Sequence, residues 1–217
     1  FDVCVEACGL SNTFLNCIDA VAFAGNIITN VTIEGESIEV EPQAFAHCYN
    51  LNEIYLSNCS SVNYEDMFYN SNNITKANVP RNFVSDLCEN NRDKLNELTI
   101  NYGDLTGRAV TDMSSLTELT ILPSVSILTD GPLISNCSSL ITVNMPSVSV
   151  NELFGDHNTR NKVVNVVAPV TQIRHFSKNL QNVTISFGEL KDDRKYHTGS
   201  NVFGEDNDQL KTLKFDD

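Results

Sequence analysis

The sequence predicts an α/β repeat solenoid, and three observations support that prediction. Apolar residues recur with a near-constant period along the 217-residue chain. Within each period they alternate with polar residues over a few positions, which is typical of a strand with one buried face. The rest of each period carries small and aromatic residues three or four positions apart, which is typical of a helical turn. Because one such unit cannot bury its apolar face alone, we expect the units to stack.

The strand part of each period has an apolar residue at a first position and again three and five positions later. In the segment AFAHCYNLNEIYL these residues are Leu51, Ile54 and Leu56. The first positions are about 23 residues apart on average, which lies within the range of stacked repeat units. Ten units fit the template, and they start at Val5, Ile28, Leu51, Ile74, Leu95, Leu116, Leu140, Val163, Leu180 and Leu210.

The second part of each period predicts short helices or 3₁₀ turns on the convex side of the stack. Ala44, Phe45 and Cys48 show the pattern of a small/aromatic pair followed by a small residue. A proline often follows the strand motif and marks its end, since proline cannot donate to a strand ladder. These prolines are Pro80, Pro123, Pro146 and Pro169. A right-handed parallel β-helix has coils of similar length, but the helical spacing favours a solenoid with helical turns.

The repeats predict a single domain over residues 1–217. Residues 1–27 form an N-terminal repeat or cap. Residues 187–217 form an irregular C-terminal repeat, because the segment KDDRKYHTGS inserts a loop. The chain begins with Phe1 and not with methionine, so we expect it to be a piece of a longer protein whose targeting segment is absent.

The charge balance excludes several classes of partner. The net charge is −14, from 28 acidic and 14 basic residues. A nucleic-acid partner needs clusters of Lys and Arg, and docking on an anionic membrane needs the same. No apolar run is long enough to span a bilayer. The sequence therefore predicts no nucleic-acid binding and no membrane insertion, and it leaves the oligomeric state open.

The cysteine and histidine residues do not form a pattern that indicates chemistry. Seven cysteines are spread along the chain, without a pair at metal-ligand spacing. We expect most to be buried free thiols that fill tight positions in the repeat, as at Cys48 and Cys137. A disulfide among Cys4, Cys8 and Cys17 is left open. Although His47 adjoins Cys48, neighbours on a helical turn point apart, so we predict no catalytic residue, no metal site and no cofactor.

Three segments resemble a known family. AFAHCYNLNEIYLSNCSSV, PLISNCSSLITVNMPSVSV and SSLTELTILPSVSIL are similar to the BspA-type (Treponema pallidum-type) leucine-rich repeats. The resemblance implies a leucine-rich-repeat horseshoe or arc of about ten units with a parallel concave sheet. It also implies a non-enzymatic, secreted or cell-surface protein that acts in adhesion or host-protein binding.

The outward residues of the predicted strands are the candidates for binding. They form a polar surface with one aromatic side chain, Tyr55, so a carbohydrate site is a weaker hypothesis than a protein-binding face. The ligand would be a protein, such as a host or extracellular-matrix protein. The structural alternative is a spacer segment of a longer surface stalk with no partner of its own. The candidate face consists of Glu53, Tyr55, Lys76, Asn78, Glu97, Thr99, Glu118 and Thr120.

Overall fold

The structure is a computed structural model of the chain. It describes residues 2–6, 17–19, 21–34, 38–57, 59–60, 66–128, 131–148, 150, 152–173, 175–177, 179–186 and 208–216. For residues 2–6, 17, 60 and 170 it describes the backbone alone. The candidate disulfide among Cys4, Cys8 and Cys17 therefore lies outside the described side chains.

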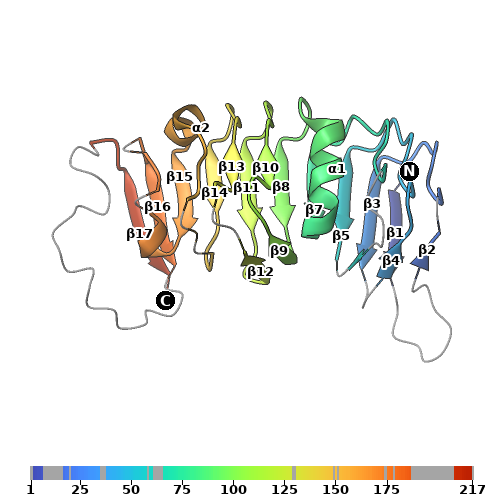
Figure 1. The fold of residues 1–217 in the computed structure, drawn as a ribbon, viewed down its shortest axis with the longest axis horizontal. Helices are drawn as coiled ribbons and strands as arrows, with labels where there is room; N and C mark the ends of the chain where they lie inside the picture. The colour runs from blue at the N-terminus through green and yellow to red at the C-terminus, as the bar shows by residue number, and fades with distance from the viewer. Residues whose placement is uncertain are drawn as a thin grey trace.

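Within the described residues, ten parallel strands form one continuous sheet, and their order in the sheet is their order in the chain (Figure 1). Each inner strand pairs with its predecessor and its successor in the sheet. The ten strands are β1 (Asp2–Glu6), β3 (Asn30–Glu34), β5 (Glu53–Leu56), β7 (Lys76–Val79), β8 (Glu97–Ile100), β11 (Glu118–Ile121), β14 (Thr142–Asn144), β15 (Asn165–Ala168), β16 (Asn182–Ser186) and β17 (Thr212–Asp216). This arrangement confirms the predicted repeat fold with a parallel sheet.

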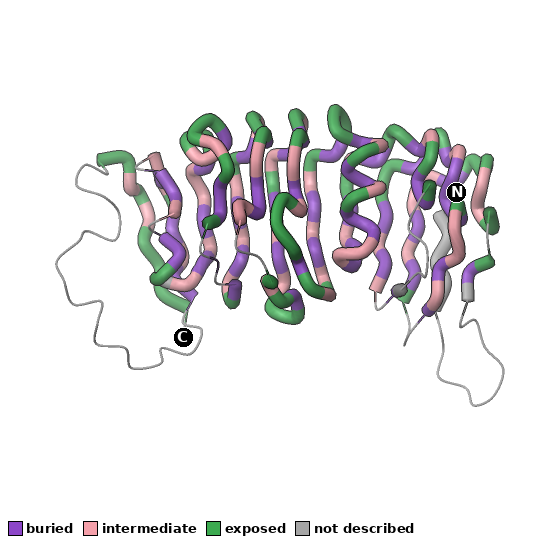
Figure 2. The backbone as a smooth tube through the Cα atoms, viewed as in Figure 1, coloured by how far each residue is buried: buried purple, intermediate pink, exposed green. Residues whose placement is uncertain are grey.

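Alternate residues of these strands enter the core, as the purple and pink segments of Figure 2 show. Ile54 and Leu56 are 2% and 0% exposed, and the equivalent residues from β3 to β16 are equally buried. Removing an aliphatic side chain of this size from water stabilises the fold by about 1.5–3 kcal/mol. The last strand differs, because Leu213 and Phe215 at the same positions are 41% and 57% exposed.

The neighbouring units are joined by the same backbone hydrogen bond at the start of successive strands. The amide of Asn52 donates to the carbonyl of Thr29 at 2.7 Å, and the amide of Thr75 donates to that of Asn52 at 2.8 Å. Asn96 and Thr117 continue the series. These bonds give the backbone amides at the strand starts a partner in the adjacent unit.

The side of the core opposite this sheet, called the outer side below, is more varied than the sequence predicts. Among the residues that the structure describes, it contains three small parallel sheets. They are formed by β2 (Cys17–Ile18), β4 (Ile38–Val40) and β6 (Cys59–Ser60), by β9 (Gly103–Leu105) and β12 (Val125–Ile127), and by β10 (Val110–Thr111) and β13 (Ile134–Ser135). Backbone groups of consecutive outer segments lie close enough to pair, which a pattern within one unit cannot reveal.

In the described part of the chain, three helices replace these ladders at other places. They are α1 (Arg81–Asn91), α2 (His157–Lys162) and α3 (Val170–Ile173). In α1, the residues Phe83, Val84 and Leu87 are buried, so the helix presents one apolar face to the core. Pro80 precedes this helix, where its fixed φ and missing N–H carry little cost.

The turns that carry Phe23, Phe45 and Phe68 share one conformation. The three rings stack, with centroids 5.5 and 5.7 Å apart. Gln43 and His47 flank Phe45, and both have a positive φ of 58°. This region of backbone space costs about 1–2 kcal/mol per residue without a compensating contact. Here the amides of Phe45 and His47 donate to carbonyls of the next turn, which offsets the strain.

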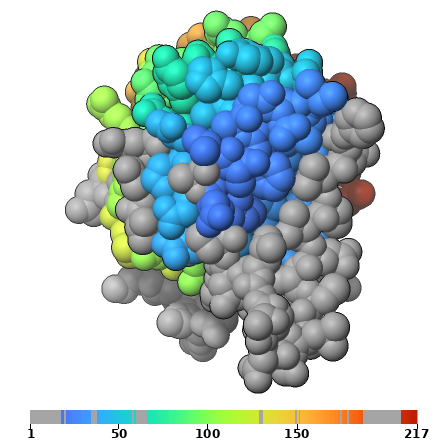
Figure 3. Space-filling model, turned by 90° about the vertical axis from the view of Figure 1, so that its right-hand side faces the viewer, coloured from blue at the N-terminus to red at the C-terminus, as the bar shows by residue number. Residues whose placement is uncertain are grey.

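The end of the stack nearest β3 is shown in Figure 3, where the segment 21–34, in blue, lies at the surface. Val21 and Ile27 in this segment are 53% and 60% exposed. The first of the stacked turns therefore presents apolar atoms to solvent.

Candidate functional site

The structure places all eight candidate residues on one face of the ten-stranded sheet. Pairing in register aligns Glu53, Lys76, Glu97 and Glu118 in one row across β5, β7, β8 and β11. Tyr55, Asn78, Thr99 and Thr120 form a second row beside the first. All eight side chains are exposed or half-buried. We call these two rows the sheet face.

The first row alternates acid, base, acid and acid. Lys76 Nζ lies 2.7 Å from Glu97 Oε2. The hydrogen bond and charge of Glu97 raise the pKa of Lys76, and the charges of Glu53 and Glu118 add to this. Glu53 and Glu118 make no ion pair with any residue that the structure describes. The row therefore carries a net negative charge that a partner can neutralise.

A hollow of about 380 Å³ lies over β3, β5, β7 and β8. Six of the eight candidates line it, namely Glu53, Tyr55, Lys76, Asn78, Glu97 and Thr99. Asn30, Thr32 and Glu34 also line it, and the candidate set does not include them. The sequence did indicate that Asn30 and Thr32 belong to this face. They occupy the same positions of the preceding strand as Glu53 and Tyr55, with which they pair. Glu118 and Thr120 lie outside the hollow.

The same face changes character toward the C-terminal strands. Asn165 Nδ2 donates to Thr142 Oγ1 at 3.1 Å, and Asn182 Nδ2 donates to Asn165 Oδ1 at 2.7 Å. These side chains are neutral and bind one another across β14, β15 and β16. The first row is therefore charged on β5, β7, β8 and β11 and neutral on β14, β15 and β16.

The model of one known protein family matches part of this chain. The family model for the BspA type leucine rich repeat region (6 copies) matches residues 4–94. Residues 4–94 are thus similar to BspA-type leucine-rich repeats, and the match spans less than half of the chain. The match covers β3, β5, β7 and α1, and it includes half of the sheet face. Neither the search of curated proteins nor that of solved structures returned a match.

The BspA-type repeats have general properties that bear on the sheet face. Leucine-rich repeats commonly mediate protein binding and are generally non-enzymatic. Proteins with repeats of the BspA type are typically secreted or at the cell surface. Within the described residues, the helices are all too short or too polar to cross a membrane.

Four cysteines of the described residues occupy tight positions in the core. Cys48, Cys59, Cys88 and Cys137 are buried free thiols. Burial raises the pKa of Cys59 and of Cys88 to about 12, and that of Cys137 to about 11. Because the thiolate is the reactive form, these side chains are poor nucleophiles.

His47 and Cys48 point in different directions. Cys48 Sγ donates to the carbonyl of Phe23 at 2.9 Å, inside the core. The His47 ring lies outside, with its centroid 5.4 Å from that of Tyr69 and 5.8 Å from that of Tyr49. Tyr49 and Tyr69 are about half exposed. This aromatic cluster of His47, Tyr49 and Tyr69 was missed from sequence, because its members come from two units and occupy different positions in them.

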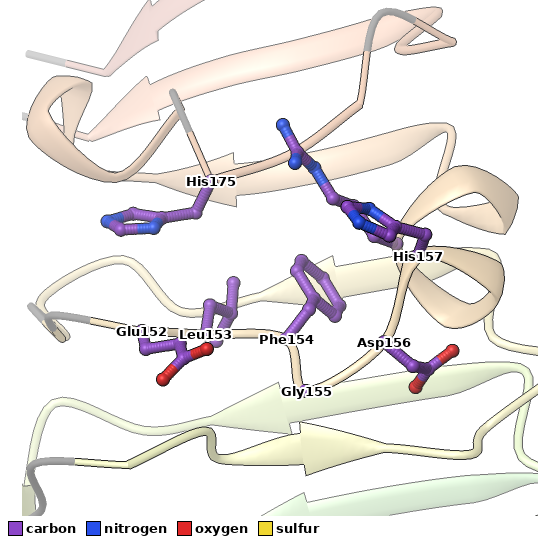
Figure 4. A pocket seen from close by; sticks show the side chains of 8 residues that line it. Glu152, Leu153, Phe154, Gly155, Asp156, His157 and His175 are labelled. Atoms are coloured by element: carbon purple, nitrogen blue, oxygen red, sulfur yellow. The ribbon is translucent and has the colours of Figure 1, made fainter.

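A second hollow, of about 300 Å³, lies beyond the BspA-type match and away from the sheet face (Figure 4). Phe154 lies at its centre, and it bridges to Ile134 at the end of the β10–β13 ladder. His157, Arg160 and His175 also line it. Sequence reasoning missed this site because His157 and His175 belong to different units. Among the described residues, groups of His, Cys, Asp or Glu that could hold a metal ion are absent.

Proposed function

We propose that the chain is a non-enzymatic protein-binding or adhesion module of a secreted or cell-surface protein, and that its ligand binds on the sheet face. The observation that carries this proposal is the hollow over β3 to β8, which six candidate residues line. Tyr55 supplies the aromatic group there, and tyrosine is enriched among residues that dominate binding energy.

The charges of the sheet face favour a partner with a basic surface. Glu53 and Glu118 flank the Lys76–Glu97 pair, and the chain as a whole is strongly acidic. Such a field accelerates association with a basic partner and makes it dependent on salt. A host or extracellular-matrix protein with exposed Lys and Arg fits this chemistry. No cofactor and no catalytic group is part of the proposal.

We further propose that each strand of the large sheet represents one repeat. The chain would then be a single-domain solenoid of about ten units over residues 1–217, with a concave sheet and the helices on its convex side. The shared backbone bonds between successive units support this proposal. Residues 1–27 would serve as the N-terminal repeat or cap, and residues 187–217 as an irregular last repeat.

The binding proposal is tested with a panel of purified extracellular-matrix proteins and surface plasmon resonance. For any member that binds, the double variant Tyr55→Ser, Glu97→Gln should weaken affinity about tenfold or more, which corresponds to about 1.4 kcal/mol. The matched control changes Tyr102 and Glu89, an exposed tyrosine and glutamate away from the sheet face, in the same way. Equal affinity of the sheet-face variant and the wild type would remove this face from the proposal.

The spacer function remains the second candidate, because one observation favours it. Leu213 and Phe215 expose apolar atoms on β17 at positions that β3 to β16 bury. A strand of this kind can pack against a further repeat, as a stalk would require. A panel without any binding protein, together with dimensions in small-angle scattering that match a rigid rod, would favour the spacer over the binding module.

A further inference from the structure

One wall of the second hollow is held by close side-chain contacts and by hydrogen bonds to a carboxylate. A Cβ on Gly155 would come within 3.1–3.3 Å of Ser135 and Pro132, so this position suits glycine. The next residue, Asp156, caps α2, and its carboxylate accepts hydrogen bonds from Thr159 and from the amide of Asn136. The loop that forms one wall of the hollow is thereby held in place.

Asp156 is not available to compensate a positive charge in this hollow. Burial alone would raise its pKa, but the hydrogen bonds from Thr159 and Asn136 outweigh burial and lower the pKa below its ordinary value. The group is therefore ionised, and both of its oxygens are engaged. In Figure 4 its carboxylate turns away from the Phe154 ring.

Arg160 is the charged residue of the hollow whose bonding is incomplete. Its Nη2 donates to the carbonyl of Phe176 at 2.8 Å. Its Nε is buried and has no hydrogen-bond partner. No carboxylate of the described residues lies within ion-pair distance of the guanidinium. A buried N–H of a charged group is costly to leave unpaired, and an oxyanion is its preferred acceptor.

Two imidazoles complete the lining. His157 and His175 lie on opposite sides of Phe154 in Figure 4, and each neutral imidazole carries one N–H donor. Glu152 is exposed and lies on the His175 side of the hollow. Its negative charge would repel a ligand that carries several negative charges. The hollow therefore suits a small anion of low charge.

We propose that this hollow binds a small oxyanion, a carboxylate or a phosphate group, with Arg160 as the principal donor and His157 and His175 beside it. The volume of about 300 Å³ is at the lower end of the range for small-molecule sites. The site is independent of the sheet face, and its failure would leave the proposed protein-binding function untouched.

The proposal is tested by titrating the full chain with sodium phosphate and, separately, with sodium acetate, while sodium chloride keeps the ionic strength constant. The readout is the NMR signal of the Arg160 Nε–H group, which is assigned by its loss in Arg160→Lys. A saturable shift of this signal with either anion is expected, at millimolar affinity. The anion that binds more tightly identifies phosphate or carboxylate as the preferred group. An unchanged Arg160 signal with both anions would overturn the proposal.

The affinity of variants for the same anions, measured by calorimetry, provides an independent test. Arg160→Lys keeps the charge but lacks the Nε donor, and it should weaken binding about tenfold or more. The control Arg81→Lys alters an arginine of α1 and should bind as the wild type does. If Arg160→Lys fails to fold, Glu152→Gln decides, because removing the opposing charge should strengthen binding about threefold. Unchanged affinity in Glu152→Gln would then contradict the proposal.

Discussion

The ten-stranded sheet and the outer side are built from the same repeats, yet one is uniform and the other varies. From β3 to β16 the paired residues occupy equivalent positions of successive units. On the outer side the same part of the period forms a short ladder, a stacked turn or a helix. Each sheet strand must match its neighbour's hydrogen-bond pattern, whereas the outer segment needs only to cover the core and lead back to the next strand.

The residues of the two sides therefore have different roles. Those of the outer side stabilise the fold, and those of the sheet face form the candidate site. The outer side holds buried aromatic stacks and buried polar side chains that join adjacent units. The sheet face carries exposed pairs, such as Lys76–Glu97, whose side chains are 55% and 47% exposed. Substitutions at the buried contacts of the outer side should therefore change stability, while substitutions on the sheet face should affect binding and leave the fold intact.

The largest effect is expected at the stacked phenylalanines. Phe45 is fully buried between Phe23 and Phe68. Phe45→Ala should lower the free energy of unfolding in urea by about 3–5 kcal/mol, because it removes both ring contacts and leaves a cavity. The control Tyr49→Ala removes a half-exposed aromatic ring nearby and should cost far less. Similar losses in both variants would show that the stack contributes little.

A smaller loss is expected at a buried hydroxyl that joins two units. Ser71 Oγ accepts from the amide of Cys48 at 2.8 Å and donates to the carbonyl of Phe45. Ser71→Ala leaves both backbone groups without this partner and should cost about 1–3 kcal/mol in urea unfolding. Ser85→Ala, at an exposed position of α1, serves as the control. Equal stability of Ser71→Ala and the wild type would mean that water replaces the hydroxyl.

A stabilising change is expected at the acidic group of α1 that faces the adjacent turn. Burial raises the pKa of Asp86 from 3.8 to about 6, although the amide of Phe68 donates to it. The folded state therefore binds the proton more tightly than the unfolded state, and the wild type loses stability as pH rises from about 4 to about 6. Asp86→Asn removes this loss.

Urea unfolding at two pH values measures this effect. At pH 8 Asp86→Asn should be more stable than the wild type by about 1 kcal/mol, a value reduced because the group is partly exposed to solvent. Below about pH 3 the two proteins should differ little, since the wild-type carboxyl is then mostly protonated in both states. Glu53→Gln, on the sheet face, provides the control. A difference that is larger in acid than at pH 8 would contradict the sign of this prediction.

The smallest effect is expected for the ion pair of the sheet face. A double-mutant cycle with Lys76→Ala and Glu97→Ala should give a coupling free energy of about 0.2–1 kcal/mol. This coupling should decrease at about 1 M salt, because exposed charges are screened. A coupling above about 2 kcal/mol that persists in salt would show that the pair contributes to stability and would weaken the contrast between the two sides.

Much of the site's placement could be predicted because strand alternation is a local property. Glu53 and Tyr55 alternate with Ile54 and Leu56, and the equal period places each beside its counterpart in the next unit. The hollow around Phe154 could not be predicted, since its lining comes from two units. The aromatic cluster of His47, Tyr49 and Tyr69 also escaped, because its members come from two units and occupy different positions in them.

The sequence by itself determined the repeat, the parallel sheet and the division of strand residues into core and surface, because these follow from which side chains leave water. Only the tertiary structure decided the form of the outer side. The left-handed backbone at Gln43 and His47, which carries no glycine, is held by bonds to the following unit. The guanidinium of Arg160 is likewise placed by Phe176, sixteen residues away. These conformations are selected by contacts between units, and not by the conformational preferences of the residues within a single unit.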